Sequence, residues 1–117
     1  MPKREVVISS HAQEQLQSLL DRLRAWGVRA FGGSEGADLY VCRLLDELDD
    51  VLSRLATQPD MYPLVLDAGL AELGYRRFLV RKQIVGIFRV DGNTVKIRGF
   101  FDARADYQRT LALELRQ

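Results

Sequence analysis

The sequence of 117 residues is poor in the side chains that cross-link chains or bind metals. It contains one cysteine, Cys42, and one histidine, His11. A single cysteine excludes an internal disulfide, and one histidine and one cysteine in different segments cannot supply the clustered ligands of a zinc site. We therefore expect no metal and no cofactor. Cys42 falls within an apolar helical pattern, where a buried small hydrophobic residue is expected.

Long apolar runs are also missing. No stretch approaches the roughly 18 consecutive apolar residues that a membrane-spanning helix needs, and the charged start MPKREVVISS lacks the apolar core of a secretion signal. The composition, 47% hydrophobic and 28% charged, is typical of an ordinary globular protein. These features predict a single cytoplasmic domain over residues 1–117.

Charge is unevenly distributed along the chain, although the net charge is only +1. Residues 1–74 carry 7 Lys/Arg against 12 Asp/Glu, whereas residues 75–117 carry 10 Lys/Arg against 4 Asp/Glu. Such asymmetry is typical of a protein whose basic end meets an anionic partner. The alternative is that an acidic helix and a basic sheet are simply solvated.

The first half of the chain predicts a strand at 4–9 and a helical hairpin at 11–57. Ser10 and Gln13 have the spacing of a capping box at the start of the first helix, and Gly27 has the place of its C-cap. Pro59 should stop the second helix, which begins near residue 37. Apolar residues at helical spacing form one buried stripe on each helix: Leu16, Leu19, Leu20, Leu23 and Trp26, then Val41, Leu44, Leu45, Leu48, Leu52 and Leu55.

The second half predicts a sheet. A connector at 58–74 leads to a β-meander at 75–101, whose first strand spans 75–82 and whose short turns make it antiparallel. Asp102 is the expected N-cap of a helix at 103–115. The predicted fold class is therefore α+β in the order β-α-α-β-β-β(-α), with the helical hairpin packed on a small, mainly antiparallel, twisted sheet.

Basic and aromatic side chains gather on the predicted strands. Neighbouring strands lie about 5 Å apart, so basic groups on one face would merge into a patch suited to phosphate oxygens. On the last strand, alternation places Gly99 and Phe101 on one face and Arg98 and Phe100 on the other. Phe100, Phe101 and Tyr107 would offer stacking surfaces for unpaired bases, although Phe88 and Phe101 fit the core better. The expected binding residues are Arg77, Arg81, Lys82, Arg89 and Lys96.

Four segments, in this order, resemble the RelE/ParE family of toxins from bacterial type II toxin–antitoxin systems. They are LGYRRFLV at 73–80, IVGIFRVDG at 84–92, VKIR at 95–98 and DARADY at 102–107. The tripeptide MYP at 61–63 resembles the connector of many members. The resemblance is continuous over 60–111 and looser over 3–59. It implies the α+β fold predicted above and a toxin whose inhibition of growth is relieved by a cognate antitoxin, which wraps its helices and sheet.

The resemblance implies two classes of target. RelE-type toxins cut messenger RNA on the ribosome, using basic residues and a tyrosine or arginine to assist attack by the ribose 2′-hydroxyl. ParE-type toxins inhibit DNA gyrase and have no nuclease chemistry. Matched by position, this chain retains Arg76 and Tyr107 of the nuclease set and carries Val85 and Phe101 where arginines are expected. The possible substitutes are Arg104, Arg77, Arg81 and Arg98.

Three functional hypotheses follow from this comparison. The depleted nuclease set favours a toxin that acts by binding DNA gyrase. The alternative is a ribosome-dependent mRNA endonuclease whose catalytic residues are Arg76, Arg98, Arg104 and Tyr107. The third is a non-toxic or degenerate interaction module on the same fold.

Overall fold

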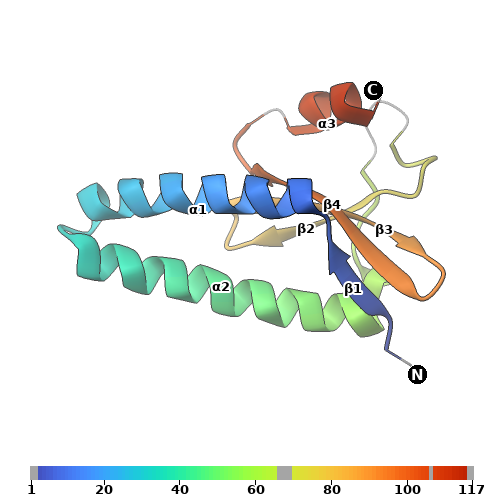
Figure 1. The fold of residues 1–117 in the computed structure, drawn as a ribbon, viewed down its shortest axis with the longest axis horizontal. Coiled ribbons are helices and arrows are strands. Elements are labelled where there is room, and N and C mark those ends of the chain that lie inside the picture. Colours follow the sequence, from blue (N-terminus) through green and yellow to red (C-terminus); the bar gives the residue numbers. More distant parts are fainter. Residues whose placement is uncertain (1–2, 66–69, 106, 116–117) are drawn as a thin grey trace.

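The computed structural model describes residues 3–65, 70–105 and 107–115, without the side chains of residues 108, 112 and 115. Figure 1 shows two long antiparallel helices packed against a small sheet, with a third helix near the C-terminus at the top of the view. In the described part of the chain, no helix is long and apolar enough to cross a membrane. The elements are β1 (Glu5–Ile8), α1 (Ser10–Ala30), α2 (Ser34–Thr57), the 3₁₀ turn η1 (Pro59–Met61), β2 (Arg76–Val80), β3 (Ile84–Asp91), β4 (Thr94–Asp102) and α3 (Tyr107–Leu115).

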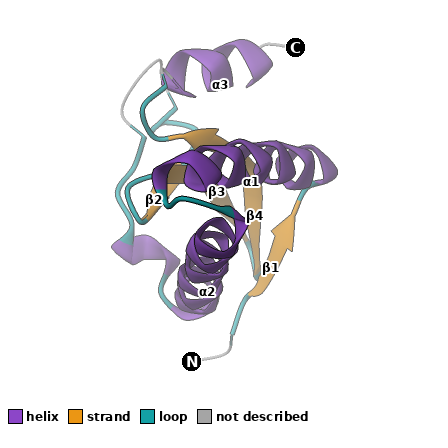
Figure 2. Cartoon of the chain, turned by 90° about the vertical axis from the view of Figure 1, so that its left-hand side faces the viewer, coloured by secondary structure: helices purple, strands orange, loops and turns teal. Residues whose placement is uncertain are grey.

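The sheet has the strand order β1-β4-β3-β2. β2, β3 and β4 form an antiparallel meander, and β1 pairs in parallel with β4 from Glu5 opposite Thr94 to Ile8 opposite Ile97. This arrangement confirms the predicted α+β class and the mainly antiparallel sheet. In Figure 2, α1 and α2 lie on one side of the strands, and α3 lies apart from them.

Each side of the sheet has its own core, because the strands alternate their side chains between the two faces. The larger core lies under α1 and α2 and includes Leu19, Leu23, Leu44, Leu48, Leu55, Phe78, Phe88, Val95, Ile97 and Phe100. The smaller core lies on what we call the outer face, under α3 and the connector. It consists of Val65, Leu70, Tyr75, Val85, Ile87, Phe101, Tyr107 and Leu111.

A β-bulge in β4 changes the alternation that the sequence predicts. Ile87 pairs with Gly99 while its neighbour Phe88 pairs with Ile97, so Arg98 is an extra residue on β4. After the bulge, Phe100 rather than Gly99 faces the helices. Phe100 is 1% exposed there, in the larger core. The expected availability of Phe100 for base stacking was wrong for this reason.

The ends of α1 also differ from the prediction. Ser9, in extended conformation, is the N-cap, and its hydroxyl accepts the Ala12 N–H at 3.1 Å. Ser10 is already helical. Gly27 does not end the helix, which continues to Ala30. Its role is close packing, since a Cβ at Gly27 would lie 3.2 Å from the Cβ of Ala37 on α2.

The tip of the helical hairpin projects past the end of the sheet (Figure 1). Residues near the tip are therefore less buried than their helical spacing predicts. Trp26 is 43% exposed, and Cys42 is exposed rather than buried. Leu45, in the middle of α2, is 38% exposed for a different reason: its neighbour Leu44, at 1% exposed, occupies the covered face, and Leu45 lies beside that face. The hydrophobic stripe of each helix continues where the sheet no longer covers it.

The chain leaves β4 by a turn rather than by the start of a helix. Asp102 is the last residue of β4, and its carboxylate accepts the Arg104 N–H at 2.9 Å. This side chain closes a local turn, so it does not cap the helix. α3 begins at Tyr107, four residues later than predicted.

Candidate functional site

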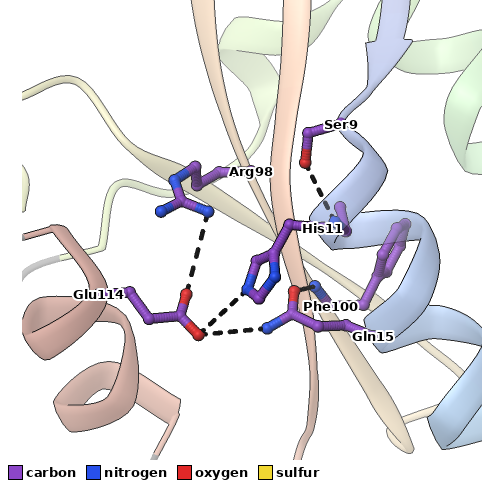
Figure 3. Close-up of polar contacts among 7 residues, drawn as sticks. Ser9, His11, Gln15, Arg98, Phe100 and Glu114 are labelled. Atoms are coloured by element: carbon purple, nitrogen blue, oxygen red, sulfur yellow. Dashed lines mark hydrogen bonds and ion pairs between the residues drawn. The ribbon is translucent and has the colours of Figure 1, made fainter. Parts of the chain in front are cut away.

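A row of side chains crosses the outer face at one end of the sheet. The register pairs Arg89 of β3 with Lys96 of β4, and Lys96 with Val7 of β1. Tyr75, which precedes β2, lies next to Arg89 in this row. The guanidinium carbon of Arg89 is 5.4 Å from the centroid of the Tyr75 ring. Arg98 follows on β4 and extends towards α3 (Figure 3). We call Arg89, Lys96 and Arg98 the basic row.

Two members of the basic row are held by short local contacts. Lys96 Nζ lies 3.0 Å from Asp91 Oδ2, and this hydrogen bond and charge lower the pKa of the Asp91 carboxyl. The Arg89 guanidinium packs over the Tyr75 ring as a cation–π pair, which orients its planar fork of donors. Such an oriented fork is well suited to a carboxylate or phosphate of a partner.

The third member, Arg98, belongs to a polar cluster centred on Glu114 of α3 (Figure 3). Its Nη1 lies 3.9 Å from Glu114 Oε2. The other carboxylate oxygen lies 3.3 Å from His11 Nε2 and accepts the Gln15 side-chain N–H at 3.5 Å. Both His11 and Gln15 belong to α1. The cluster therefore ties α3 to α1 and to β4.

Gln15 also completes the edge of β4. β1 pairs with β4 only as far as Ile97, so the N–H of Phe100 has no neighbouring strand on that side. The Gln15 side-chain oxygen accepts this N–H at 3.1 Å. Gly99 makes room for the approach, because a Cβ there would lie 2.8 Å from the same oxygen. A side chain of α1 thus takes the place of a strand.

A hollow of about 400 Å³ lies beside this cluster. Its size is at the lower end of ligand pockets in proteins. Its walls come from the start of α1, the end of β4 and α3, and they carry both basic and acidic groups. The polar residues among them include His11, Glu14, Arg22, Asp102, Tyr107 and Thr110.

Tyr107 and Arg77 meet across the outer face. The Arg77 guanidinium donates to the Tyr107 hydroxyl oxygen at 3.2 Å. The Tyr107 ring is 8% exposed and packs against Phe101, with 6.2 Å between the ring centroids. A residue predicted for catalysis and a residue predicted for binding are therefore in contact, within the smaller core.

Arg76 lies on the opposite side of the sheet. It pairs with Phe88, which faces the helices. Its guanidinium donates to the carbonyl oxygens of Tyr62 at 2.6 Å and Asp60 at 3.4 Å. These bonds fix the connector to the start of β2, and they direct the Arg76 charge away from the basic row.

The remaining predicted residues lie in turns. Arg81 and Lys82 form the β2–β3 turn, so β2 ends at Val80 rather than at 82. Both have left-handed backbones, with φ of 48° and 59°, an uncommon conformation for two successive residues other than glycine. This turn is at the end of β3 away from Arg89. Arg104 is exposed beside Asp102, with 3.7 Å between Nε and Oδ1.

The predicted residues therefore separate into different settings. Arg89, Lys96 and Arg98 share one surface, Arg77 meets Tyr107 nearby, and the others are dispersed. Phe101, at 8% exposed, belongs to the smaller core, in keeping with the core interpretation. Within the described ranges, no group of three or more His, Cys, Asp or Glu could hold a metal ion. The arrangement is suited to binding an anionic surface.

Sequence reasoning missed the residues that support the basic row. Glu114, which pairs with Arg98, and Gln15, which donates to Glu114, were not identified as partners of the site. Glu114 is 103 residues from His11 in the chain, and no local pattern links the two. Only the placement of α3 beside α1 brings them together.

The sequence matches no protein-family model and no curated protein. Among solved structures, the chain resembles one chain of a chromosomal ParDE TA system from P. aeruginosa, with a TM-score of 0.58 and 17% sequence identity. The match covers 86% of this chain and 96% of that one. At this identity, the likeness establishes a shared fold. The chain therefore has the fold of a protein from a ParDE TA system, in agreement with the fold that the RelE/ParE resemblance implied.

Proposed function

We propose that this chain is the toxin of a toxin–antitoxin pair in the cytoplasm, that it inhibits growth by binding DNA gyrase, and that a cognate antitoxin relieves the inhibition. One observation carries the proposal. The fold matches a chain of a ParDE TA system over 96% of that chain's length, which leaves little of that chain unmatched. The sequence motifs at 73–107 support the same assignment.

The geometry favours binding over RNA cleavage. A general acid or base must lie within about 3 Å of the atom it serves, and catalytic groups must converge on one point. Arg76 is turned to the connector carbonyls on the opposite side of the sheet from Tyr107. The Tyr107 hydroxyl accepts a hydrogen bond from Arg77, and Arg98 extends to Glu114. These contacts place Arg76 on the opposite side of the sheet from Tyr107 and Arg98.

The basic row is the proposed contact with the target. Arg89 and Lys96 are adjacent on the outer face, and Lys96 is 56% exposed. Charge on such a surface accelerates encounter with an acidic partner and fixes its orientation. An antitoxin that covers this row would relieve inhibition by occupying the same surface.

A supercoiling assay tests the proposal. Purified DNA gyrase acts on relaxed plasmid while the chain is titrated, and we expect supercoiling to fall. The double variant Arg89→Gln/Lys96→Gln should need a higher concentration for the same effect. Arg54→Gln on α2 is the matched control, because Arg54 lies on the helical hairpin, away from the basic row. Full supercoiling at saturating wild-type protein would refute gyrase as the target.

The nuclease hypothesis has one observation in its favour, namely the contact between the Arg77 guanidinium and the Tyr107 hydroxyl. A guanidinium beside a phenol could bind a phosphate oxygen next to a group that can transfer a proton. Toeprinting of ribosomes programmed with messenger RNA tests it directly. Cleavage in the decoding site that Tyr107→Phe abolishes would establish this alternative in place of gyrase binding. The remaining hypothesis, a non-toxic module, predicts that neither assay responds.

A further inference from the structure

Three aromatic side chains gather at the tip of the helical hairpin, far from the basic row. Trp26 comes from the last turns of α1, Phe31 directly follows this helix, and Tyr40 comes from α2. Their ring centroids lie 5.5–5.6 Å apart, pair by pair. Trp26 is 43% exposed, Phe31 is 49% exposed and the neighbouring Leu39 is 55% exposed. Contiguous apolar surface of this kind on a small protein is typical of an interaction site.

A hollow of about 340 Å³ opens between this aromatic cluster and the β2–β3 turn. Its lining is apolar at one side and cationic at the other: Phe31, Gly36, Leu39, Tyr40, Arg43 and Arg81. Gly36 allows Phe31 to lie close, since a Cβ at residue 36 would be 2.8 Å from the Phe31 Cβ. We call this hollow the tip site.

Tyr40 lines the tip site, but its hydroxyl is enclosed by the protein. The hydroxyl of Tyr40 is buried, and no residue in the described part of the chain accepts a hydrogen bond from it. Burial raises the pKa of Tyr40, while the charges of Arg81 and Arg104 act in the opposite direction. An enclosed hydroxyl cannot contact a ligand, so the polar contacts of the tip site come from Arg43 and Arg81.

We propose that the tip site binds an acidic segment of a partner protein. The segment inserts an apolar side chain between Phe31 and Leu39 and places a carboxylate against the Arg81 guanidinium. Arg43 extends the positive charge to a second carboxylate. The inference stands without the proposed toxin function, because it rests only on this lining.

Charge favours an acidic peptide over a nucleic acid. Glu35 and Asp38 line the adjoining hollow on the other side of Phe31, where Asp38 pairs with Arg24 at 2.8 Å. A nucleic-acid backbone carries a negative charge at every nucleotide and would meet these carboxylates. A peptide can place its acidic residues against Arg43 and Arg81 alone.

The only tryptophan of the chain reports on this site. The sequence contains one Trp, and Trp26 packs against both Phe31 and Tyr40. The probe is a tryptophan-free synthetic peptide that alternates Asp or Glu with Leu and Phe. Two control peptides replace its acidic residues by Lys or its apolar residues by Ser. We expect a saturable change of Trp26 fluorescence with the acidic apolar peptide and none with either control.

Variants separate this site from general electrostatic attraction. Arg81→Asn removes the charge and keeps a residue that tolerates positive φ. This variant should bind the acidic peptide roughly tenfold more weakly, as expected from the loss of a charge-assisted hydrogen bond. Lys82→Asn is the matched control, because Lys82 has the same backbone conformation but does not line the hollow. Leu39→Ser should also weaken binding, whereas Lys82→Asn should leave it unchanged.

Four results would overturn the proposal. They are equal affinity of the Arg81→Asn and Lys82→Asn variants, binding of the Lys-bearing peptide, a stronger response to an RNA oligonucleotide, or a dimer that Leu39→Ser dissociates. The last result, measured by analytical ultracentrifugation, would make a second copy of the chain the occupant. Absence of gyrase inhibition together with intact peptide binding would instead refute only gyrase as the target of the proposed toxin.

Discussion

The guanidinium of Arg77 on β2 donates a hydrogen bond of 3.2 Å to the hydroxyl oxygen of Tyr107 on α3. This bond ties the C-terminal helix to an edge strand, across the smaller core. The Glu114 cluster ties the other end of α3 to α1 and β4. α3 is therefore held at both ends, by Arg77 of β2 at its start and by Arg98 of β4 and His11 of α1 near its end.

Tyr107→Phe removes one end of the Arg77 bond and keeps the ring in its core. We expect the free energy of unfolding to fall by about 1 kcal/mol, the usual contribution of one partly buried hydrogen bond. Urea unfolding measures the change. Arg77→Met should cost a similar amount, and the double variant should cost less than the sum of the two, because the same bond is lost in each. Strict additivity would mean that the bond does not contribute.

Gly86→Ala tests the packing between β3 and β2. A Cβ at residue 86 would collide with the ring of Phe78, which is buried in the larger core. We expect a loss of about 3 kcal/mol from overpacking, measured by thermal or urea unfolding. The additional change Phe78→Leu should recover part of that loss. If Gly86→Ala alone is neutral, Phe78 does not lie over Gly86 as described.

Lys96→Met tests the contact between Lys96 and Asp91. That contact lowers the pKa of Asp91 below its ordinary value of 3.8. A carboxyl with a lowered folded-state pKa contributes stability that is present above its ordinary pKa and is lost as pH falls through the lowered value. In the variant, the Asp91 midpoint from a carboxyl NMR titration should rise towards 3.8. An unchanged midpoint would contradict the contact.

Gln15→Leu tests the side chain that replaces a strand beside β4. The variant leaves the Phe100 N–H without its acceptor, which should cost about 1–3 kcal/mol. Hydrogen exchange of the Phe100 amide should become faster. Gln17→Leu is the control, because Gln17 bonds only the exposed Asp21 in the same helix. Equal effects of the two variants would show that the Gln15–Phe100 hydrogen bond does not contribute to the stability of the fold.

Helical periodicity predicted most of the larger core. Leu19, Leu23, Leu44, Leu48 and Leu55 follow their expected stripes because each lies where the sheet covers the hairpin. Trp26 has the same spacing but lies exposed near the tip of the hairpin. The spacing of a helix specifies which face is apolar, whereas the extent of the sheet decides how far along the helix that face is buried.

The candidate site was predictable only in part. The pairing of Arg89 with Lys96 follows from counting back along both strands from the Gly92 turn. The bulge at Arg98 has no signal in the alternation of β4, since only the register with β3 creates it. Arg76 lies one position from Arg77, so it necessarily faces the other side of the sheet.

Colony counts test the central claim, that the chain is a toxin held in check by a partner, more directly than any other measurement. The chain is expressed from a tightly repressed promoter, alone or with the product of the neighbouring reading frame. We predict that induction alone lowers the count and that co-expression restores it, while Arg89→Gln/Lys96→Gln is less toxic than Arg54→Gln. Unchanged counts after induction of soluble wild-type protein would contradict the account.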